Sequence, residues 1–174
     1  MLLRSIVNFT RPELAQGIKI SSPATGNVVP VETLPGSNMA MTNLGQGVAI
    51  KLEGHGVNSP INGQVIEYIP SYGKLIIQAK NKLRFLLQLP IESIKFNGLG
   101  IQPLIKLGQN VTIGQPLLLL DLYKLQQMYK PVLLYVLLLD HKKFKAIDVP
   151  HKHVVVGEDP IFSLIPRPIK EVKT

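Results

Sequence analysis

The sequence contains no cysteine, and this absence removes two classes of site. Disulfide bonds and thiolate metal sites both require the thiol, so neither is available to this chain, which fits a reducing compartment. No cysteine nucleophile is present either, and no serine lies in a G-x-S-x-G motif. The common signatures of covalent hydrolysis are therefore absent.

Long hydrophobic runs are also missing. The longest uncharged apolar run, PVLLYVLLL at 131–139, is about half of the ~20 residues that a membrane-spanning helix needs. The start of the chain, MLLRSIVNFTRPE, is interrupted by Arg4 and Arg11 too early for a signal peptide. We therefore expect a soluble, cytoplasmic protein without a transmembrane segment.

Acidic residues are scarce, with 11 Asp and Glu against 19 Lys and Arg, for a net charge of +8. This excess favours acidic partners without choosing among them. No block of Lys and Arg is interleaved with aromatic residues, so we expect no nucleic-acid partner. The carboxylates are scattered, which gives no acid/base pair, and neither a complete G-x-G-x-x-G nor a P-loop is present.

What the chain does have is 14 glycines and 14 prolines, spread over 174 residues. Short segments separated by turns are typical of all-β proteins, and the length suits one domain. We predict an antiparallel β-sandwich or partly closed barrel over residues 20–166. Residues 1–19 are predicted to form a flexible N-terminal arm with a helical turn at 10–16, and 167–174 a C-terminal tail.

Two similar segments form an internal repeat: SPATGNVVPV from Ser22 and SPINGQVIEY from Ser59. Each predicts a tight turn that leads into a strand, with the proline presetting φ and the glycine supplying a positive φ. Gly108 and Gly114 predict a further pair of turns. Strands are predicted at 47–52, 74–79, 83–89, 93–96, 116–122, 132–139 and 161–166, and a short helix at 121–130.

The segment KLRFLLQLP, residues 82–90, places an amide inside an apolar strand. Alternation puts Leu83, Phe85, Leu87 and Leu89 on one face and Lys82, Arg84, Leu86 and Gln88 on the other. The pattern therefore predicts that Gln88 faces outward beside two cations.

Four histidines are the candidates for a phosphate acceptor or a metal ligand near neutral pH: His55, His141, His151 and His153. His55 lies in a Gly-His-Gly loop, where an exposed turn residue is expected. His151 and His153 alone make an incomplete zinc site, since zinc takes three or four protein ligands. We predict no metal and no cofactor.

The order and spacing of several segments resemble a known family. SPATGNVVPVETLPGSNMA, LGQGVAIKLEG, SPINGQVIEYI, the run from GLGI to LLLLDL, and VVVGEDPIF together resemble the glucose-type enzyme IIA (EIIA type-1) domain of the phosphoenolpyruvate-dependent sugar phosphotransferase system. The resemblance covers residues 20–166 and implies an antiparallel β-sandwich, in agreement with the pattern.

The resemblance also implies where a phosphoryl group would be carried. In that family one histidine takes phosphate from the histidine phosphocarrier protein and passes it to a sugar-specific enzyme IIB, and a second histidine supports it. The matching segments here, FLLQLPIESI and SYGK, place Gln88 and Gly73 at those positions. A carboxamide nitrogen has its lone pair delocalised, so Gln88 cannot accept phosphate, and paired imidazoles for zinc are lost as well.

The docking face of the family implies a partner-binding face in this chain, in which some of the family's residue types are replaced. Gly36 and Met39 stand where the family has Asp and Phe, Leu86 where it has Phe, and Glu92 where it has Asp. The expected face comprises Gly36, Met39, Ile69, Ser71, Gly73, Leu86, Gln88 and Glu92. Residues 74–95 hold five cations and one anion, which would weaken docking of a basic phosphocarrier protein.

These observations predict a phosphorylation-incompetent, non-enzymatic EIIA-like protein that serves as a regulatory or protein-interaction module, with an acidic protein or a phosphotransferase-system component as partner. Two alternatives stay open. One is a phosphocarrier that uses a relocated histidine such as His55 or His141, and the other is a basic β-domain that binds an acidic partner. The sequence leaves the oligomeric state open.

Overall fold

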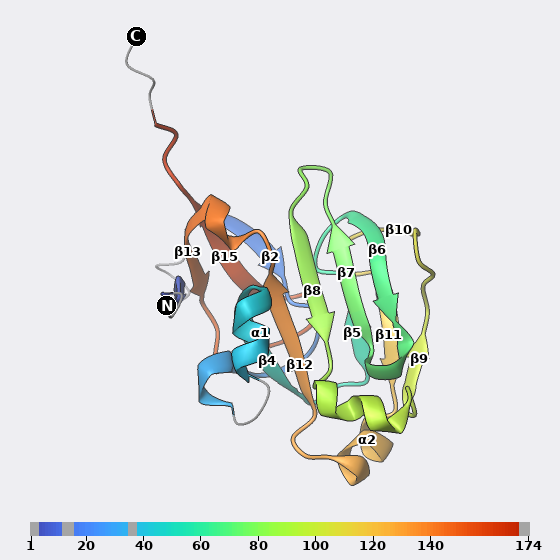
Figure 1. Ribbon diagram of the computed structural model, residues 1–174. Coiled ribbons are helices and arrows are strands. Elements are labelled where there is room, and N and C mark those ends of the chain that lie inside the picture. Colours follow the sequence, from blue (N-terminus) through green and yellow to red (C-terminus); the bar gives the residue numbers. More distant parts are fainter. Residues whose placement is uncertain (1–3, 12–15, 35–37, 171–174) are drawn as a thin grey trace.

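The computed structural model describes residues 4–11, 16–34 and 38–170, and this part of the chain is mostly β (Figure 1). The largest sheet has eight strands in the order β10-β6-β7-β8-β12-β4-β3-β14. Their bounds are β10 Asn110–Val111, β6 Gly63–Ile69, β7 Lys74–Gln78, β8 Arg84–Gln88, β12 Leu133–Leu138, β4 Gln46–Leu52, β3 Gly26–Pro30 and β14 His153–Val154.

Two smaller sheets and a few short helices complete the described fold. One sheet contains β1 Val7–Phe9, β13 Phe144–Val149, β15 Pro160–Pro166 and β2 Ile18–Ser21, and the other contains β5 Gly56–Asn58, β11 Pro116–Leu120 and β9 Ile101–Pro103. The α-helices are α1 Asn38–Leu44 and α2 Leu122–Met128, and the 3-10 helices are η2 Val31–Thr33, η3 Pro70–Tyr72, η4 Ile91–Phe96 and η5 His141–Lys143. No described helix has the length and apolarity to cross a membrane.

The sheets pack as a sandwich, which confirms the predicted fold class, and they do not close into a barrel. The described ladders are antiparallel except for β1 beside β13. A main core lies between the eight-stranded sheet and the two smaller sheets, and it includes Phe85 from β8, Leu118 from β11 and Phe162 from β15. Each predicted strand except 93–96 corresponds to a strand of the structure.

A second, smaller core lies on the other face of the eight-stranded sheet, which α1 and η2 cover (Figure 1). Strand β12 is buried on both faces, so its side chains alternate between the two cores. Leu134, Val136 and Leu138 belong to the main core, and Leu133, Tyr135 and Leu137 to the second. A strand covered on both faces needs a continuous apolar run, which explains LLYVLL.

The internal repeat forms two equivalent structures. The Ser22 hydroxyl donates to the Ala24 carbonyl at 2.8 Å and the Ser59 hydroxyl to the Ile61 carbonyl at 2.7 Å. The positive φ predicted for the repeat glycines is found at Gly26, at 157°, but not at Gly63, and the predicted turn glycines Gly108 and Gly114 also adopt it, at 84° and 82°. A Cβ at Gly26 would collide with the Lys51 carbonyl of the neighbouring strand, and Gly63 meets Gln78 in the same way, so both repeat glycines permit close strand approach.

The strand predicted at 93–96 is wrong, because these residues lie in the 3-10 helix η4, which begins directly after Pro90. The helix predicted at 121–130 is confirmed as α2, which Asp121 caps by accepting from the Lys124 N–H at 3.0 Å. The predicted flexible arm, 1–19, contains β1 and the start of β2, both paired with other strands. The helical turn predicted at 10–16 falls mostly outside the described residues.

Candidate functional site

Gln88 is the last residue of β8, and it is buried. Its side chain is 3% exposed, and its Nε2 faces the Met41 sulfur of α1 at 3.7 Å. The strand alternation was predicted correctly, since Leu87 and Leu89 enter the main core while Leu86 enters the second core. The prediction that Gln88 faces outward beside cations is wrong, because α1 and its neighbours cover that face.

Gly73 lies on the segment next to Gln88, but a side chain there would point elsewhere. It follows η3 with φ of 62°, and Leu89 donates its backbone N–H to the carbonyl of Tyr72. A Cβ at Gly73 would face Leu118 at 3.4 Å and Leu89 at 3.7 Å, both in the main core. The two positions that the resemblance pairs therefore open toward opposite faces of the sheet.

The other residues of the expected partner-binding face differ in accessibility. Leu86 is 1% exposed in the second core, so it offers no surface. Ile69 and Ser71 are half-buried and Glu92 is exposed. The Gly98 N–H donates to the Ser71 carbonyl at 2.9 Å, which holds η3 beside η4. Gly36 lies outside the described residues, and of Met39 only the backbone, in α1, is described.

Beside the Gln88 end of β8 a groove of about 230 Å³ opens, which we call the η4 groove. Tyr135, the register partner of Gln88, forms part of its lining. The full lining is Leu34, Pro90, Glu92, Ser93, Lys95, Phe96, Tyr129, Lys130, Pro131, Leu133 and Tyr135. No sequence pattern predicted this groove, because its residues come from three segments that are far apart in the chain.

Aromatic rings shape the η4 groove. The rings of Phe96 and Tyr129 stack with centroids 5.9 Å apart, and the Lys95 ammonium lies 5.1 Å from the Phe96 centroid. Burial raises the pKa of Tyr129 to about 12, so its phenol stays neutral at physiological pH. Ile91 and Ile94 of η4, which do not belong to the groove lining, are 47% and 49% exposed. An apolar surface with a charged edge is typical of protein-binding faces.

The cations of residues 74–95 do not form one patch. Lys74 pairs with Glu67 at 3.0 Å, and Arg84 pairs with Asp140 at 3.0 Å. Lys80 and Lys82 lie in the β7–β8 hairpin, whereas Lys95 lies in η4 at the opposite end of β8 (Figure 1). The sequence therefore overestimates the positive charge that lies close to Gln88 in space.

The four histidines lie apart from Gln88, and His55, His141 and the neighbouring pair His151 and His153 lie on three different segments. His55 follows β4, and its Nδ1 lies 3.1 Å from the Leu120 carbonyl, so the proton sits on Nδ1 and the Nε2 lone pair is free. It borders a depression of about 460 Å³ that Asp121 also lines. His141 begins η5, and its Nδ1 is buried without a partner among the described residues. His141 is therefore at the Arg84 end of β8, since Asp140 bonds Arg84.

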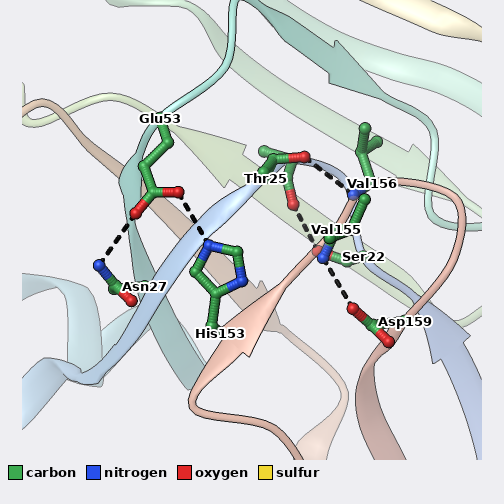
Figure 2. Close-up of polar contacts among 9 residues, drawn as sticks. Ser22, Thr25, Asn27, Glu53, His153, Val155, Val156 and Asp159 are labelled. Atoms are coloured by element: carbon green, nitrogen blue, oxygen red, sulfur yellow. Dashed lines mark hydrogen bonds and ion pairs between the residues drawn. The ribbon is translucent and has the colours of Figure 1, made fainter.

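His153 takes part in a polar cluster on the edge strand β14 (Figure 2). Its Nε2 lies 2.8 Å from Glu53, which also accepts from the Asn27 amide at 3.1 Å. The loop after β14 is tied to the first repeat, because the Val156 N–H donates to the Thr25 hydroxyl at 3.0 Å. These contacts fasten β14 to β3. His151 is half-buried nearby, and the described residues hold no group of three or more His, Asp or Glu placed to bind a metal.

A family model described as phosphoenolpyruvate-dependent sugar phosphotransferase system, EIIA 1, matches residues 18–144. The chain belongs to this EIIA family. The match spans β2 to the start of β13, and it therefore includes Gln88, Gly73 and the whole η4 groove.

Individual members agree with this assignment. The chain is 27% identical over 153 residues to a PTS system glucose-specific EIIA component of Staphylococcus epidermidis, covering 87% of this chain and 92% of that protein. It is 26% identical over 147 residues to the glucose-specific EIIA component of Buchnera aphidicola, covering 84% and 88%. The solved glucose permease IIA from Mycoplasma capricolum matches with a TM-score of 0.74 at 20% identity, covering 83% and 94%, which supports the fold.

Proposed function

We propose that this EIIA protein is a phosphorylation-incompetent member of the phosphotransferase system that acts as a regulatory, protein-binding module. The observation that carries the proposal is the state of Gln88: a carboxamide, 3% exposed, against the Met41 sulfur. A phosphoryl acceptor needs a nucleophilic lone pair and an open path for the donor. Gln88 has neither.

The surroundings of Gln88 support the same conclusion. Strand pairing places Tyr135 of β12 opposite Gln88, and Leu87 and Leu89 flank Gln88 in the chain. None of the four histidines, all of which are described, lies on η3, on β7 or on a strand paired with β8. A histidine elsewhere would require a new alignment of the phosphoryl donor with the acceptor nitrogen. Such alignment supplies a large part of the rate acceleration of phosphoryl transfer.

The surface proposed for partner binding is η4, with its exposed Ile91 and Ile94 and its groove residue Glu92, together with Ile69 and Ser71 of the adjoining η3 segment. Apolar side chains half exposed around an aromatic-lined groove supply buried area on association, while the rim charges set orientation. A phosphotransferase-system component is the proposed partner, because the relatives are glucose-specific EIIA components.

A phosphoryl-transfer assay tests the first half of the proposal. The protein is incubated with phosphoenolpyruvate and the upstream phosphotransfer proteins, with a glucose-specific EIIA component as positive control, and acid-labile phosphate is measured on each. We expect phosphate on the control and none on this chain. Phosphate on a residue of the Gln88 region would contradict the proposal.

A binding experiment tests the second half. The isotopically labelled protein is titrated with phosphotransferase-system components, and NMR shift changes are expected at Ile91, Ile94 and the groove. The variant Ile91→Asp/Ile94→Asp is expected to lose them. A matched control, Leu107→Asp/Ile169→Asp, alters two exposed residues outside the groove and is expected to keep them. Binding that survives the first variant would rule out this surface.

One specific observation favours a second candidate, a phosphocarrier that uses His55. Its Nδ1 contact with the Leu120 carbonyl orients the ring and leaves Nε2 as a free nucleophile beside a depression. If the wild-type chain does take up phosphate, His55→Gln separates the two candidates. Loss of labelling in that variant, with labelling retained in His153→Gln, would establish His55 as the acceptor.

A further inference from the structure

A hollow formed by the described residues lies at the other end of the eight-stranded sheet from Gln88. It is a groove of about 810 Å³ between the start of β6, the β7–β8 hairpin and β10, which we call the hairpin groove. Its lining is Asn62, Gly63, Gln64, Gln78, Ala79, Lys80, Asn81, Lys82, Asn110 and Val111. Figure 1 shows the hairpin and β10 at one end of the sheet and η4 at the other. The size is within the range of small-molecule sites.

The chemistry of this lining is unusual for a protein surface. Five of the ten residues carry a carboxamide and two carry an ammonium group, while none carries a carboxylate. Lys80 and Lys82 are exposed, and neither ammonium lies within 4 Å of a carboxylate oxygen of the described chain. Lys74 and Arg84, the other cations of residues 74–84, are paired with Glu67 and Asp140. The two cations of this range that have no carboxylate partner among the described residues therefore both line the groove.

Hydrogen bonds to backbone groups determine which atoms of the Asn62, Asn81 and Gln64 side-chain amides remain available to a ligand. The Asn62 side-chain oxygen accepts from the Ile113 N–H at 2.8 Å, and the Asn81 oxygen accepts from the Leu83 N–H at 3.2 Å. The oxygen of each amide is occupied, so its NH₂ group remains as a donor. Gln64 is held in the reverse sense, since its Nε2 donates to the Gly108 carbonyl at 2.9 Å, which leaves its oxygen as an acceptor.

The β7–β8 hairpin contains one residue with an unfavourable backbone conformation. Lys82 has φ of 72°, in the left-handed region that a lysine adopts only rarely. The turn closes through the Lys82 N–H to the Ala79 carbonyl at 3.0 Å and the Ala79 N–H to the Leu83 carbonyl at 2.8 Å. A strained residue held by its surroundings is a pointer to function. This turn places Lys80 and Lys82 on the lining of the groove.

We propose that the hairpin groove binds a small phosphorylated, hydroxyl-rich molecule, with Lys80, Lys82 and the Asn62 and Asn81 NH₂ groups on the phosphate and the Gln64 amide oxygen on hydroxyls. Ammonium and amide donors without a nearby carboxylate match an oxyanion. Gln78 and Asn110 add amides that can both donate and accept, as hydroxyl recognition requires. The inference is independent of the proposed function, because the two surfaces lie at opposite ends of β8.

Titration with three probes tests the proposal: glucose 6-phosphate, glucose and inorganic phosphate, each followed by NMR and calorimetry on the full chain. We expect glucose 6-phosphate to bind more tightly than either other probe and to shift the amides of residues 62–64 and 78–82. Failure of glucose 6-phosphate to bind would overturn the proposal. Equal binding of inorganic phosphate would overturn the hydroxyl-recognition part.

Variants separate this site from general attraction to a basic protein. Lys80→Gln/Lys82→Gln is expected to weaken glucose 6-phosphate binding by about tenfold or more. The control Lys124→Gln/Lys145→Gln removes the same charge at two exposed lysines outside the groove, and its affinity is expected to stay within about twofold. An equal loss in both variants would overturn the site.

A third variant keeps the turn and changes only the donor. In Asn81→Asp the carboxylate still accepts the Leu83 N–H, but an NH₂ donor becomes a negative charge. We expect binding of glucose 6-phosphate to be lost while thermal unfolding stays near that of the wild type. Retained binding in this variant would contradict the assigned role of Asn81.

Discussion

Strand β8 has very different surroundings at its two ends. At its first residue, Arg84 is 44% exposed and forms three hydrogen bonds with Asp140, beside the open hairpin groove. At its last residue, Gln88 is 3% exposed beneath α1. In our proposal, the end of β8 at which the enzyme IIA resemblance expects chemistry is covered, while the open, polar hollow lies at the hairpin end.

The first way to test this comparison is to open the covered end. Leu86 is 1% exposed in the second core, two residues before Gln88. Leu86→Ala should lower the free energy of unfolding by about 2–5 kcal/mol, the range for a buried leucine that leaves a cavity. Denaturant unfolding measures the change. A loss below about 1 kcal/mol would mean that the second core is loosely packed and Gln88 poorly covered.

The second test removes the ion pair at the open end. Burial works to raise the pKa of Asp140, but the hydrogen bonds from Arg84 outweigh it and hold that pKa below its ordinary value. Because the pKa of Asp140 is lower in the folded than in the unfolded state, its ionised form stabilises the fold above the unfolded-state pKa of about 3.9. This stabilisation is lost as the pH falls through the folded-state pKa. Because solvent reaches Arg84, Asp140→Asn should cost only about 1 kcal/mol at neutral pH.

The pH dependence supplies the check on Asp140. The difference in unfolding free energy between wild type and Asp140→Asn should shrink as the pH is lowered below about 4. Glu67→Gln is the matched variant, since the Lys74–Glu67 pair near Gln88 has a single contact at 3.0 Å. It should cost less than Asp140→Asn. A larger cost for Glu67→Gln would reverse the comparison of the two ends.

A third test concerns the buried amide itself. The contact of Gln88 Nε2 with the Met41 sulfur is at 3.7 Å, and thioether sulfur is a weak acceptor. Gln88→Leu keeps the volume and suits the apolar surroundings, so unfolding free energy should change by less than about 1 kcal/mol. Thermal and denaturant unfolding measure this. A loss of several kcal/mol would show that the amide has a structural role that the Met41 contact does not explain.

The smallest expected effect is at the hairpin. Lys82→Asn relieves the left-handed strain, because asparagine tolerates positive φ, and should raise the unfolding free energy by about 0.5 kcal/mol. The same variant should weaken glucose 6-phosphate binding, since one ammonium is removed. A gain in stability with unchanged binding would separate the strain from the groove.

Sequence patterns predicted most of the strands but not the two surface grooves. Alternation and turn residues were sufficient for β4, β7, β8, β11, β12 and β15 and for α2. Alternation also assigned Gln88 to the right face of β8, but it cannot tell what covers that face. The cover comes from α1 and η2, short segments whose contact with β8 is set by tertiary packing. The apolar run of β12 was the available signal that both faces are buried.

The candidate sites show the same limit. Cations that are close in sequence, such as Lys82 and Arg84, differ in space, because one lies on the hairpin groove and the other is paired with Asp140 from a distant segment. The two grooves were not predictable, since each is assembled from segments far apart in the chain. Position 88 was identified by resemblance, and its burial came only from the structure.

The central proposal is that the fold itself, by burying position 88, closes this end of β8 to a phosphoryl donor whichever side chain stands there. The most direct test is phosphate uptake by Gln88→His in the presence of phosphoenolpyruvate and the upstream phosphotransfer proteins, after circular dichroism has shown that the variant is folded. Because position 88 lies under Met41 and Gly73 opens to the opposite face, the account predicts no acid-labile phosphate on the variant. Stoichiometric phosphate on the introduced imidazole would contradict it.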